Sequence, residues 1–191
     1  MKMTKTIACS VCVLAVAATA AAQTSKTSFS TYLQNAHKTM KLNLVQSAEA
    51  MPADAYGFRP AGVATEVRTW GQFIGHLTDA NNSYCAAAKG DKPGSRPSIE
   101  DKSATMSKAE LVKALTDALT YCDAAYDQAT DASLMQPLTI HGRNGATREA
   151  TAAQYLVMDL AHNNEHYGNL VTYMRAKGIV PPSTARQRTA K

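Results

Sequence analysis

The chain lacks most of the motifs by which a single sequence reveals its chemistry. It contains no Gly-x-Ser-x-Gly element, no glycine-rich phosphate loop and, beyond the first 22 residues, no second pair of cysteines that would build a structural zinc site. It also has no cluster of lysine and arginine with interleaved aromatic residues, which argues against a nucleic-acid partner. The function must therefore be sought in a smaller group of residues.

The first 22 residues have the features of a secretory signal peptide. Lys2 and Lys5 form a basic n-region, residues 7–22 are almost wholly apolar or small, and residues 18–22 contain two small-x-small cleavage sites. The alternative is an uncleaved membrane anchor, but this apolar segment is short for a span that needs about 20 residues. We expect export to the periplasm or the extracellular space, with no stable membrane insertion after cleavage.

Cleavage leaves residues 23–191, which is the length of one ordinary domain. Loss of the two lysines lowers the formal net charge from +5 to +3, a value that indicates no particular partner. The basic end, residues 186–191, is short, and we expect it to be a frayed tail.

Two cysteines, Cys85 and Cys122, remain after cleavage. In an oxidising compartment they permit one intramolecular disulfide, which would join the second predicted helix to the third. The alternative is a pair of buried free thiols, because cysteine is among the most buried residue types. The sequence leaves both states open.

Four long segments have helical patterns. The first covers residues 30–50, and the second runs from 69 to 89 with Gly90 as its C-cap. The third opens on a capping-box pattern, residues 107–110, and the last runs from about 147 to 177 before Gly178. Between the third and the last, residues 134–145 indicate an extended segment and a turn, and no strand pattern is abundant enough for a sheet. These elements predict an all-α fold, a four-helix bundle.

Histidines are the most informative residues of the chain. His162 and His166 are four residues apart on the last predicted helix, so their side chains lie on one face about one turn apart. His76 lies on the second helix, among small and apolar residues. Two histidines at this spacing and a third from a facing helix can hold one metal ion and leave a position open. The other two, His37 and His141, we interpret as an exposed helix residue and a turn residue.

The three candidate ligands define a class of metal but not its identity. Neutral imidazoles suit zinc, nickel, iron or copper, and we expect a divalent transition metal, zinc or nickel first. The alternative is that the histidines are ordinary surface or core residues. The pattern is not His-Glu-x-x-His, because the glutamate stands next to the second histidine, so the usual metalloprotease geometry is not predicted.

Three carboxylates lie one helical turn from the histidines. Asp79 follows His76 by three residues, and Asp159 and Glu165 flank His162 at the same distance in sequence. Each is a candidate to orient a histidine or to act as a general base. The alternative is that they are solvated helix acids.

Three separated segments give a family resemblance. Residues 75–80, Gly-His-Leu-Thr-Asp-Ala, and residues 162–170, His-Asn-Asn-Glu-His-Tyr-Gly-Asn-Leu, resemble the DinB/YfiT-like family, as do the tail 173–182 and the loop 56–60. The resemblance covers about residues 28–184. It implies a four-helix bundle with a divalent metal on three histidines, at positions that correspond to His76, His162 and His166. It also implies thiol-dependent transferase or isomerase activity among relatives, and dimerisation of many of them through their helices.

These observations leave two main hypotheses. The first is an exported metal-dependent hydrolase or transferase that acts on a small molecule. The second is a non-catalytic helix bundle that binds a metal or a small ligand in the same pocket. A third hypothesis, a purely structural bundle, would leave the histidines without a role.

Overall fold

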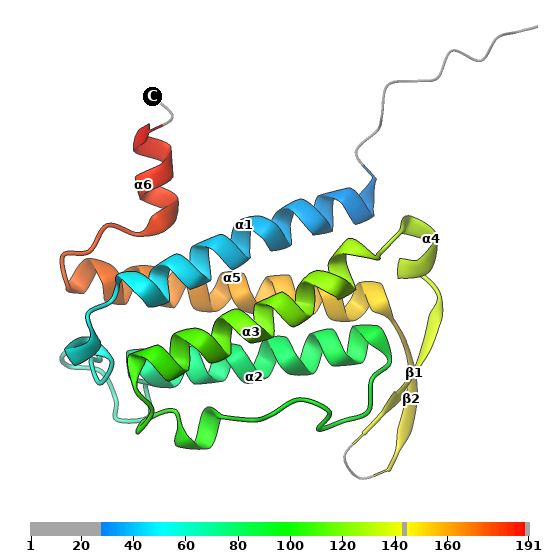
Figure 1. Cartoon of the computed structure of the whole chain (residues 1–191), viewed down its shortest axis with the longest axis horizontal. Helices are drawn as coiled ribbons and strands as arrows, with labels where there is room; N and C mark the ends of the chain where they lie inside the picture. The colour runs from blue at the N-terminus through cyan, green and yellow to red at the C-terminus, as the bar shows by residue number, and fades with distance from the viewer. Residues whose placement is uncertain (1–27, 143–144, 190–191) are drawn as a thin grey trace, which may run out of the picture.

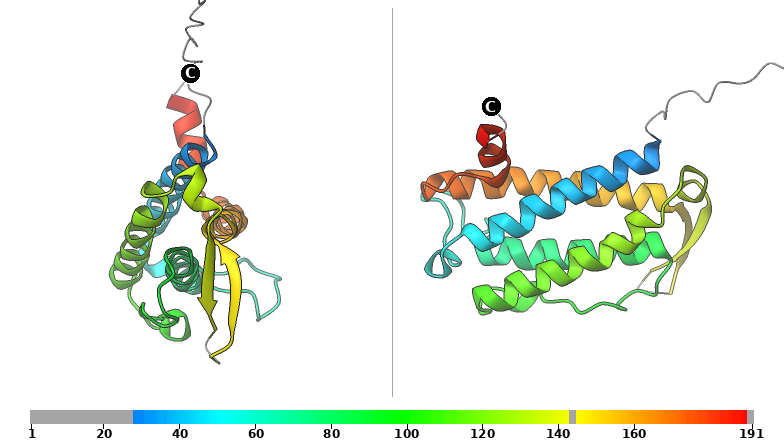
Figure 2. Two further views of the ribbon diagram at one scale, coloured as in Figure 1. Left: turned by 90° about the vertical axis from the view of Figure 1, so that its right-hand side faces the viewer. Right: turned by 45° about the horizontal axis from the view of Figure 1, so that its top comes forward.

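The computed structural model describes residues 28–142 and 145–189. Four long helices form the body of the fold: α1 (Phe29–Ala50), α2 (Trp70–Lys89), α3 (Lys108–Asp127) and α5 (Ala152–Ala176). Each of α1 and α2 packs against both α3 and α5, so α1 and α2 lie diagonally across the bundle (Figures 1 and 2). The predicted all-α four-helix bundle is confirmed. The predicted signal peptide lies outside the described residues, and no helix within those residues is long and apolar enough to cross a bilayer.

Short elements complete the chain. They are η1 (Ala53–Ala55), η2 (Glu100–Lys102), α4 (Asp131–Leu134), β1 (Pro137–His141), β2 (Thr147–Thr151) and α6 (Pro182–Thr189). The strands β1 and β2 pair antiparallel, with Pro137 opposite Thr151 and His141 opposite Thr147. This hairpin lies at the end of the bundle where α2 ends and α5 begins (Figure 1).

Local signals set the helix ends. Thr69 and Ser107 each accept a hydrogen bond from the backbone of the third helical residue, and the side chain of that residue bonds back to the cap. Gly90 ends α2 in the left-handed conformation, with φ of 73°. The predicted capping box before α3 and the predicted glycine cap after α2 are both confirmed.

The core fills the space between the four helices. Its largest fully buried side chains are aromatic or aliphatic and come from all four long helices and from α4: Trp70, Tyr126, Leu33, Leu44, Met51, Ile74, Leu77, Leu111, Leu115, Leu119, Leu134 and Leu156. Cys85 and Cys122 lie in the same core and form a disulfide that joins α2 to α3. The structure therefore decides between the two states that the sequence left open.

Three expectations are wrong. The last helix begins at Ala152 instead of near Thr147, because residues 147–151 form the second strand of the hairpin. Residues 182–189 form the helix α6 and are therefore not a frayed tail. Arg186 ties this helix to α1 by donating hydrogen bonds to Gln46 and Asn43.

The third correction concerns His37, which is buried instead of exposed, with 1% of its surface accessible. Its ring stacks on Tyr126 of α3 at a centroid distance of 4.1 Å, and its Nε2 bonds to Asp123 at 3.0 Å. Partners on a distant helix therefore decide the environment of this residue. Burial lowers the pKa of His37 even though Asp123 opposes the effect.

Candidate metal centre

The structure brings the three predicted histidines together between α2 and α5. The Nε2 atoms of His76 and His162 are 3.1 Å apart, those of His76 and His166 are 3.2 Å apart, and those of His162 and His166 are 3.1 Å apart. Three nitrogens thus form a nearly equilateral triangle. The i, i+4 spacing supplies one side of the triangle, and the packing of α2 on α5 supplies the other two.

Aromatic neighbours hold the imidazole rings in place. Phe73, one turn before His76, lies 5.5 Å from the ring of His166, and Tyr84 lies 5.6 Å from the ring of His162. His166 is buried, whereas His76 and His162 are half-buried. The cluster therefore has a rigid inner side and a side that solvent can reach.

The electrostatics keep His162 and His166 neutral. Burial lowers the pKa of His162 to about 4, and the neighbouring His166 and His76 add to the effect. Burial, followed by His76, also lowers the pKa of His166. Neutral imidazoles are the form that binds a metal ion, so the site is prepared for a cation at neutral pH.

The other ring nitrogens have different surroundings. His76 Nδ1 donates to Glu100 Oε1 at 2.9 Å, which favours the tautomer whose Nε2 has its lone pair free for a metal ion. His166 Nδ1 lies 3.2 Å from the amide of Asn169, and His162 Nδ1 is buried with no hydrogen-bond partner among the described residues. At least the first contact selects the tautomer that a metal ligand needs.

Glu100 is the functional residue that sequence reasoning missed. It begins η2, between α2 and α3, and accepts hydrogen bonds from both His76 and Arg68 (2.7 Å). Burial opposes its ionisation, but the bonds from Arg68 and His76 outweigh that effect and lower the pKa of Glu100. No helical spacing links Glu100 to His76, so no sequence pattern would have found it.

Gly75 and Asp79 fix the position of Glu100. A Cβ on Gly75 would lie 2.3 Å from the Cβ of Ser103, so only glycine lets η2 approach α2 this closely. Asp79 accepts hydrogen bonds from the backbone N–H groups of Ile99 (2.8 Å) and Glu100 (3.0 Å), and from the hydroxyl of Ser98 (2.5 Å). Asp79 therefore orients the segment that orients His76, and no contact joins it directly to a histidine.

The other two predicted carboxylates are not brought into the cluster. Asp159 is fully buried, and Tyr126 of α3 donates a hydrogen bond to its Oδ2 at 2.8 Å. Burial raises the pKa of Asp159 to about 7, although the bond from Tyr126 opposes the rise. Glu165 is exposed, and no hydrogen bond or ion pair joins it to a described residue. The geometry gives neither residue a contact with His76, His162 or His166.

The triangle of nitrogens has the dimensions of a metal site. Ligand nitrogens about 2.0–2.1 Å from one ion, at angles between octahedral and tetrahedral, are separated by roughly 2.9–3.4 Å. The three separations here fall inside that interval. Together, the fold and the site define a helix bundle that carries a three-histidine group able to hold a metal ion.

Comparisons with known proteins identify the family. The model of the DinB superfamily matches residues 38–170, and the chain belongs to that superfamily. A DinB-like protein from Bacillus cereus shares the fold with a TM-score of 0.61 at 17% identity, over 81% of this chain and 96% of that chain. A DinB-like protein from Bacillus subtilis has a TM-score of 0.55 at 18% identity, over 77% of this chain and 92% of that chain. No curated protein matches the sequence.

A third structure with the same fold is a mycothiol-dependent maleylpyruvate isomerase. Its TM-score is 0.55 at 15% identity, and the alignment covers 74% of this chain. The chain spans only 60% of the length of that isomerase. The likeness therefore concerns the helix bundle and leaves the reaction of this chain open.

Proposed function

We propose that the protein is a metal-dependent enzyme that acts on a small molecule, as a hydrolase or as a transferase. One observation carries the proposal: three imidazole nitrogens lie 3.1–3.2 Å apart, at the spacing of ligands on a single ion. His76, His162 and His166 would hold a divalent metal. When bound, such an ion polarises a substrate carbonyl or lowers the pKa of a bound water or thiol.

The residues around the histidines support a working site over a passive one. Glu100 orients His76 and places a negative charge behind it, which increases the basicity of the ligand. Arg68 neutralises part of that charge and lies at the edge of the cluster. Since three protein ligands leave further coordination positions to a substrate, the arrangement has the open character of a catalytic centre.

The choice between hydrolase and transferase rests on weaker grounds. The fold that the chain shares with a mycothiol-dependent isomerase supports a reaction that uses a low-molecular-weight thiol. The predicted export of the chain supports hydrolysis instead, because the low-molecular-weight thiols that such relatives use are cytoplasmic, whereas water is present in every compartment. We propose the hydrolase and the transferase as the two activities to assay, and zinc or nickel as the first metals to supply.

The decisive experiment measures metal content. The chain from residue 23, purified without chelator or polyhistidine tag, should contain about one equivalent of a transition metal, and His76→Ala, His162→Ala and His166→Ala should each lose it. His141→Ala is the matched control, because His141 lies on the hairpin and should leave the content unchanged. His37→Ala is a poor control, since His37 is a buried stacking residue.

Activity is measured separately, with ester substrates and with thiol transfer to an aromatic halide. We expect one of these activities in the metal-loaded protein and its loss in His162→Ala. Absence of metal from the wild type even after reconstitution would overturn the proposal. Equal metal content in all variants would do the same.

A further inference from the structure

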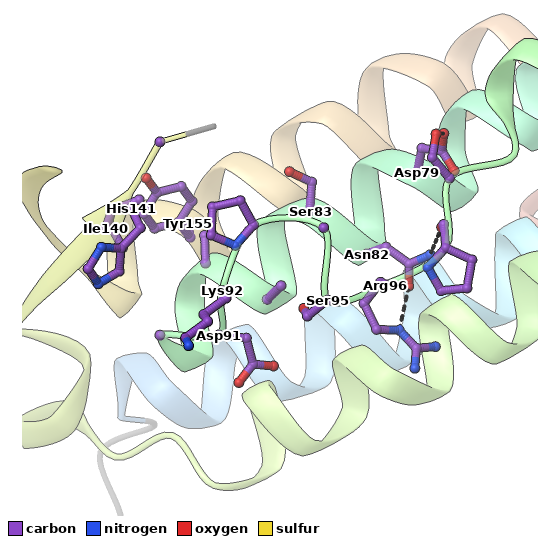
Figure 3. Close-up of a pocket in the computed structure, with 18 of the residues that line it drawn as sticks. Asp79, Asn82, Ser83, Asp91, Lys92, Ser95, Arg96, Ile140, His141 and Tyr155 are labelled. Carbon is purple, nitrogen blue, oxygen red and sulfur yellow. Dashed lines mark hydrogen bonds between the residues drawn. The ribbon is translucent and has the colours of Figure 1, made fainter. Parts of the chain in front are cut away.

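A groove begins beside the histidine cluster and runs to the hairpin. Its volume is about 510 Å³, and its walls are one face of α2, the segment 90–101, the hairpin and the start of α5. Figure 3 shows Asp79, Asn82 and Ser83 along α2, with Lys92 on the segment and His141 and Tyr155 on the hairpin side. Glu100 lines the groove and also bonds to His76, so the groove and the candidate metal centre share a wall.

Most of the acidic side chains in the groove are already neutralised. Asp79 accepts hydrogen bonds from two backbone N–H groups, and Glu100 is paired with Arg68 and His76. Asp91 pairs with Lys89 and accepts a hydrogen bond from the hydroxyl of Tyr121. The remaining acid, Asp101, is exposed and follows Glu100 at the histidine end of the groove. At the hairpin end the acid that lines the groove is Asp91, and Lys89 and Tyr121 already engage its carboxylate.

The cations at the hairpin end have no such partners. Arg148 of β2 donates to the neutral hydroxyl of Tyr155 at 2.5 Å and pairs with no carboxylate of a described residue. The exposed ammonium group of Lys92 makes no hydrogen bond or ion pair within the described part of the chain, although the Lys92 carbonyl accepts a bond from the backbone of Ser95. Lys92 and His141 also face each other across an adjoining hollow between the segment and the hairpin. The ammonium group of Lys92 and the guanidinium group of Arg148 thus line the groove without an acidic partner among the described residues.

We propose that this end of the groove binds the carboxylate of a small anionic molecule, with Lys92 and Arg148 as the anion-binding residues. Guanidinium and ammonium groups without an acidic partner are the donors that carboxylates prefer. A groove of this size holds a molecule of ordinary metabolite dimensions. That the bound anion is the substrate rests on the proposed function, since its other end would extend toward the histidines. Tyr155, held by Arg148, keeps its hydroxyl proton available to the same ligand.

The test compares benzoate with its uncharged isostere benzamide by ¹H–¹⁵N correlation spectra of the labelled protein. Benzoate should shift amides of residues 90–101 and 147–150 saturably, and benzamide should not. In the variant Lys92→Gln/Arg148→Gln the Kd for benzoate should rise at least about tenfold. The control Lys113→Gln/Arg175→Gln removes the same charge from exposed helix positions outside the groove, and its Kd should stay within about twofold of the wild type.

The same titration on His162→Ala separates this inference from the metal site. If Lys92 and Arg148 bind the anion, His162→Ala binds benzoate while its metal content falls, and Lys92→Gln/Arg148→Gln keeps its metal. Loss of benzoate binding in His162→Ala would place the anion on a metal ion and overturn the inference. Equal shifts with benzamide, an unchanged Kd in Lys92→Gln/Arg148→Gln or an absence of shifts in the wild type would overturn it as well.

Discussion

Asn81 and Asn163 bond to each other through both halves of their side-chain amides. Asn81 Nδ2 donates to Asn163 Oδ1, and Asn163 Nδ2 donates to Asn81 Oδ1, each at 2.9 Å. Both residues are fully or almost fully buried, and Asn163 directly follows His162. A reciprocal pair of this kind permits one register of α2 against α5. It therefore fixes the height at which His76 meets the two histidines of α5.

Breaking this amide pair should cost stability and metal affinity together. Asn163→Leu leaves Asn81 Oδ1 buried without the donor that Asn163 supplies, while Asn81 Nδ2 keeps its bond to Leu77 O. We expect the change to lower the free energy of unfolding by about 1–3 kcal/mol. Asn81→Leu/Asn163→Leu removes both polar groups and should recover part of that loss, because two apolar side chains of similar size replace them. Urea denaturation of the metal-free proteins measures the difference. A double variant less stable than the sum of the two single variants would contradict the pairing.

Glu100 offers a test of ligand orientation. Glu100→Gln keeps the shape of the side chain but removes the charge behind His76, and we expect metal affinity to fall by about 10–100-fold. Competition with a chromogenic chelator gives the affinity. Asp101→Asn is the matched control, because Asp101 is the next residue and is exposed, and its affinity should stay close to that of the wild type. Equal losses in both variants would indicate a general effect of charge instead of the hydrogen bond to His76.

Gly75→Ala should disturb the orientation of His76 through a steric clash, without changing any charge. The added methyl group would lie 2.3 Å from Ser103 Cβ, so η2 must move away from α2 and take Glu100 with it. We expect a loss of about 1–3 kcal/mol in the free energy of unfolding. Metal affinity should fall as well. Gly168→Ala is the control, since a Cβ there meets nothing within 4 Å, and it should be neutral or slightly stabilising.

Local sequence signals predicted the frame of the molecule and part of its site. The caps Ser107 and Gly90 and the i, i+4 spacing of His162 and His166 depend only on neighbours in the chain. The position of Glu100 depends on the path of the irregular segment between α2 and α3. No local sequence pattern is long enough to link it to its partner His76, which lies 24 residues earlier. The role of Asp79 was missed for the same reason, because its partners lie about twenty residues further along.

The first strand of the hairpin lies in the predicted extended segment, but the second strand was predicted as the start of the last helix. Residues 147–151, Thr-Arg-Glu-Ala-Thr, contain good helix formers, and the first three are exposed. Pairing with β1 stabilises them as a strand, and this long-range contact overrides local propensity. Burial of His37 has the same origin, since its partners Tyr126 and Asp123 come from α3.

Asp159 should make the stability of the fold depend on pH. Its folded-state pKa is raised to about 7, above the ordinary value of 3.8, so the native state keeps a proton that the unfolded chain releases. The contribution is therefore fully favourable below pH 4 and is lost progressively as the pH rises from about 4 to 7. Asp159→Asn cannot ionise but can still accept the bond from Tyr126. Relative to the wild type, it should gain stability between pH 4.5 and pH 8, by about 3 kcal/mol.

Urea denaturation of the metal-free proteins at the two pH values checks this expectation. The histidines titrate equally in both proteins, so their contribution cancels in the difference. Glu165→Gln serves as the control, because the exposed Glu165 should change stability by less than about 0.5 kcal/mol at either pH. A constant difference between Asp159→Asn and the wild type would show that the buried carboxyl is ionised throughout this range.

The disulfide between Cys85 and Cys122 should stabilise the bundle strongly and resist reduction in the native state. It closes a loop with a sequence separation of 37, for which the chain-entropy relation gives about 4 kcal/mol. Both sulfurs are fully buried, so a reductant reaches them only when α2 and α3 separate. We expect no free thiol in the oxidised chain from residue 23 on denaturation, slow reduction under native conditions, and a lower melting temperature for Cys85→Ala/Cys122→Ala. Two free thiols in freshly denatured protein, or rapid reduction without denaturant, would exclude a buried bond in the folded chain. Because Asn81 lies one turn before Cys85 on α2, loss of this bond should also weaken metal binding, and Cys85→Ala/Cys122→Ala measures how far α3 supports the histidine cluster.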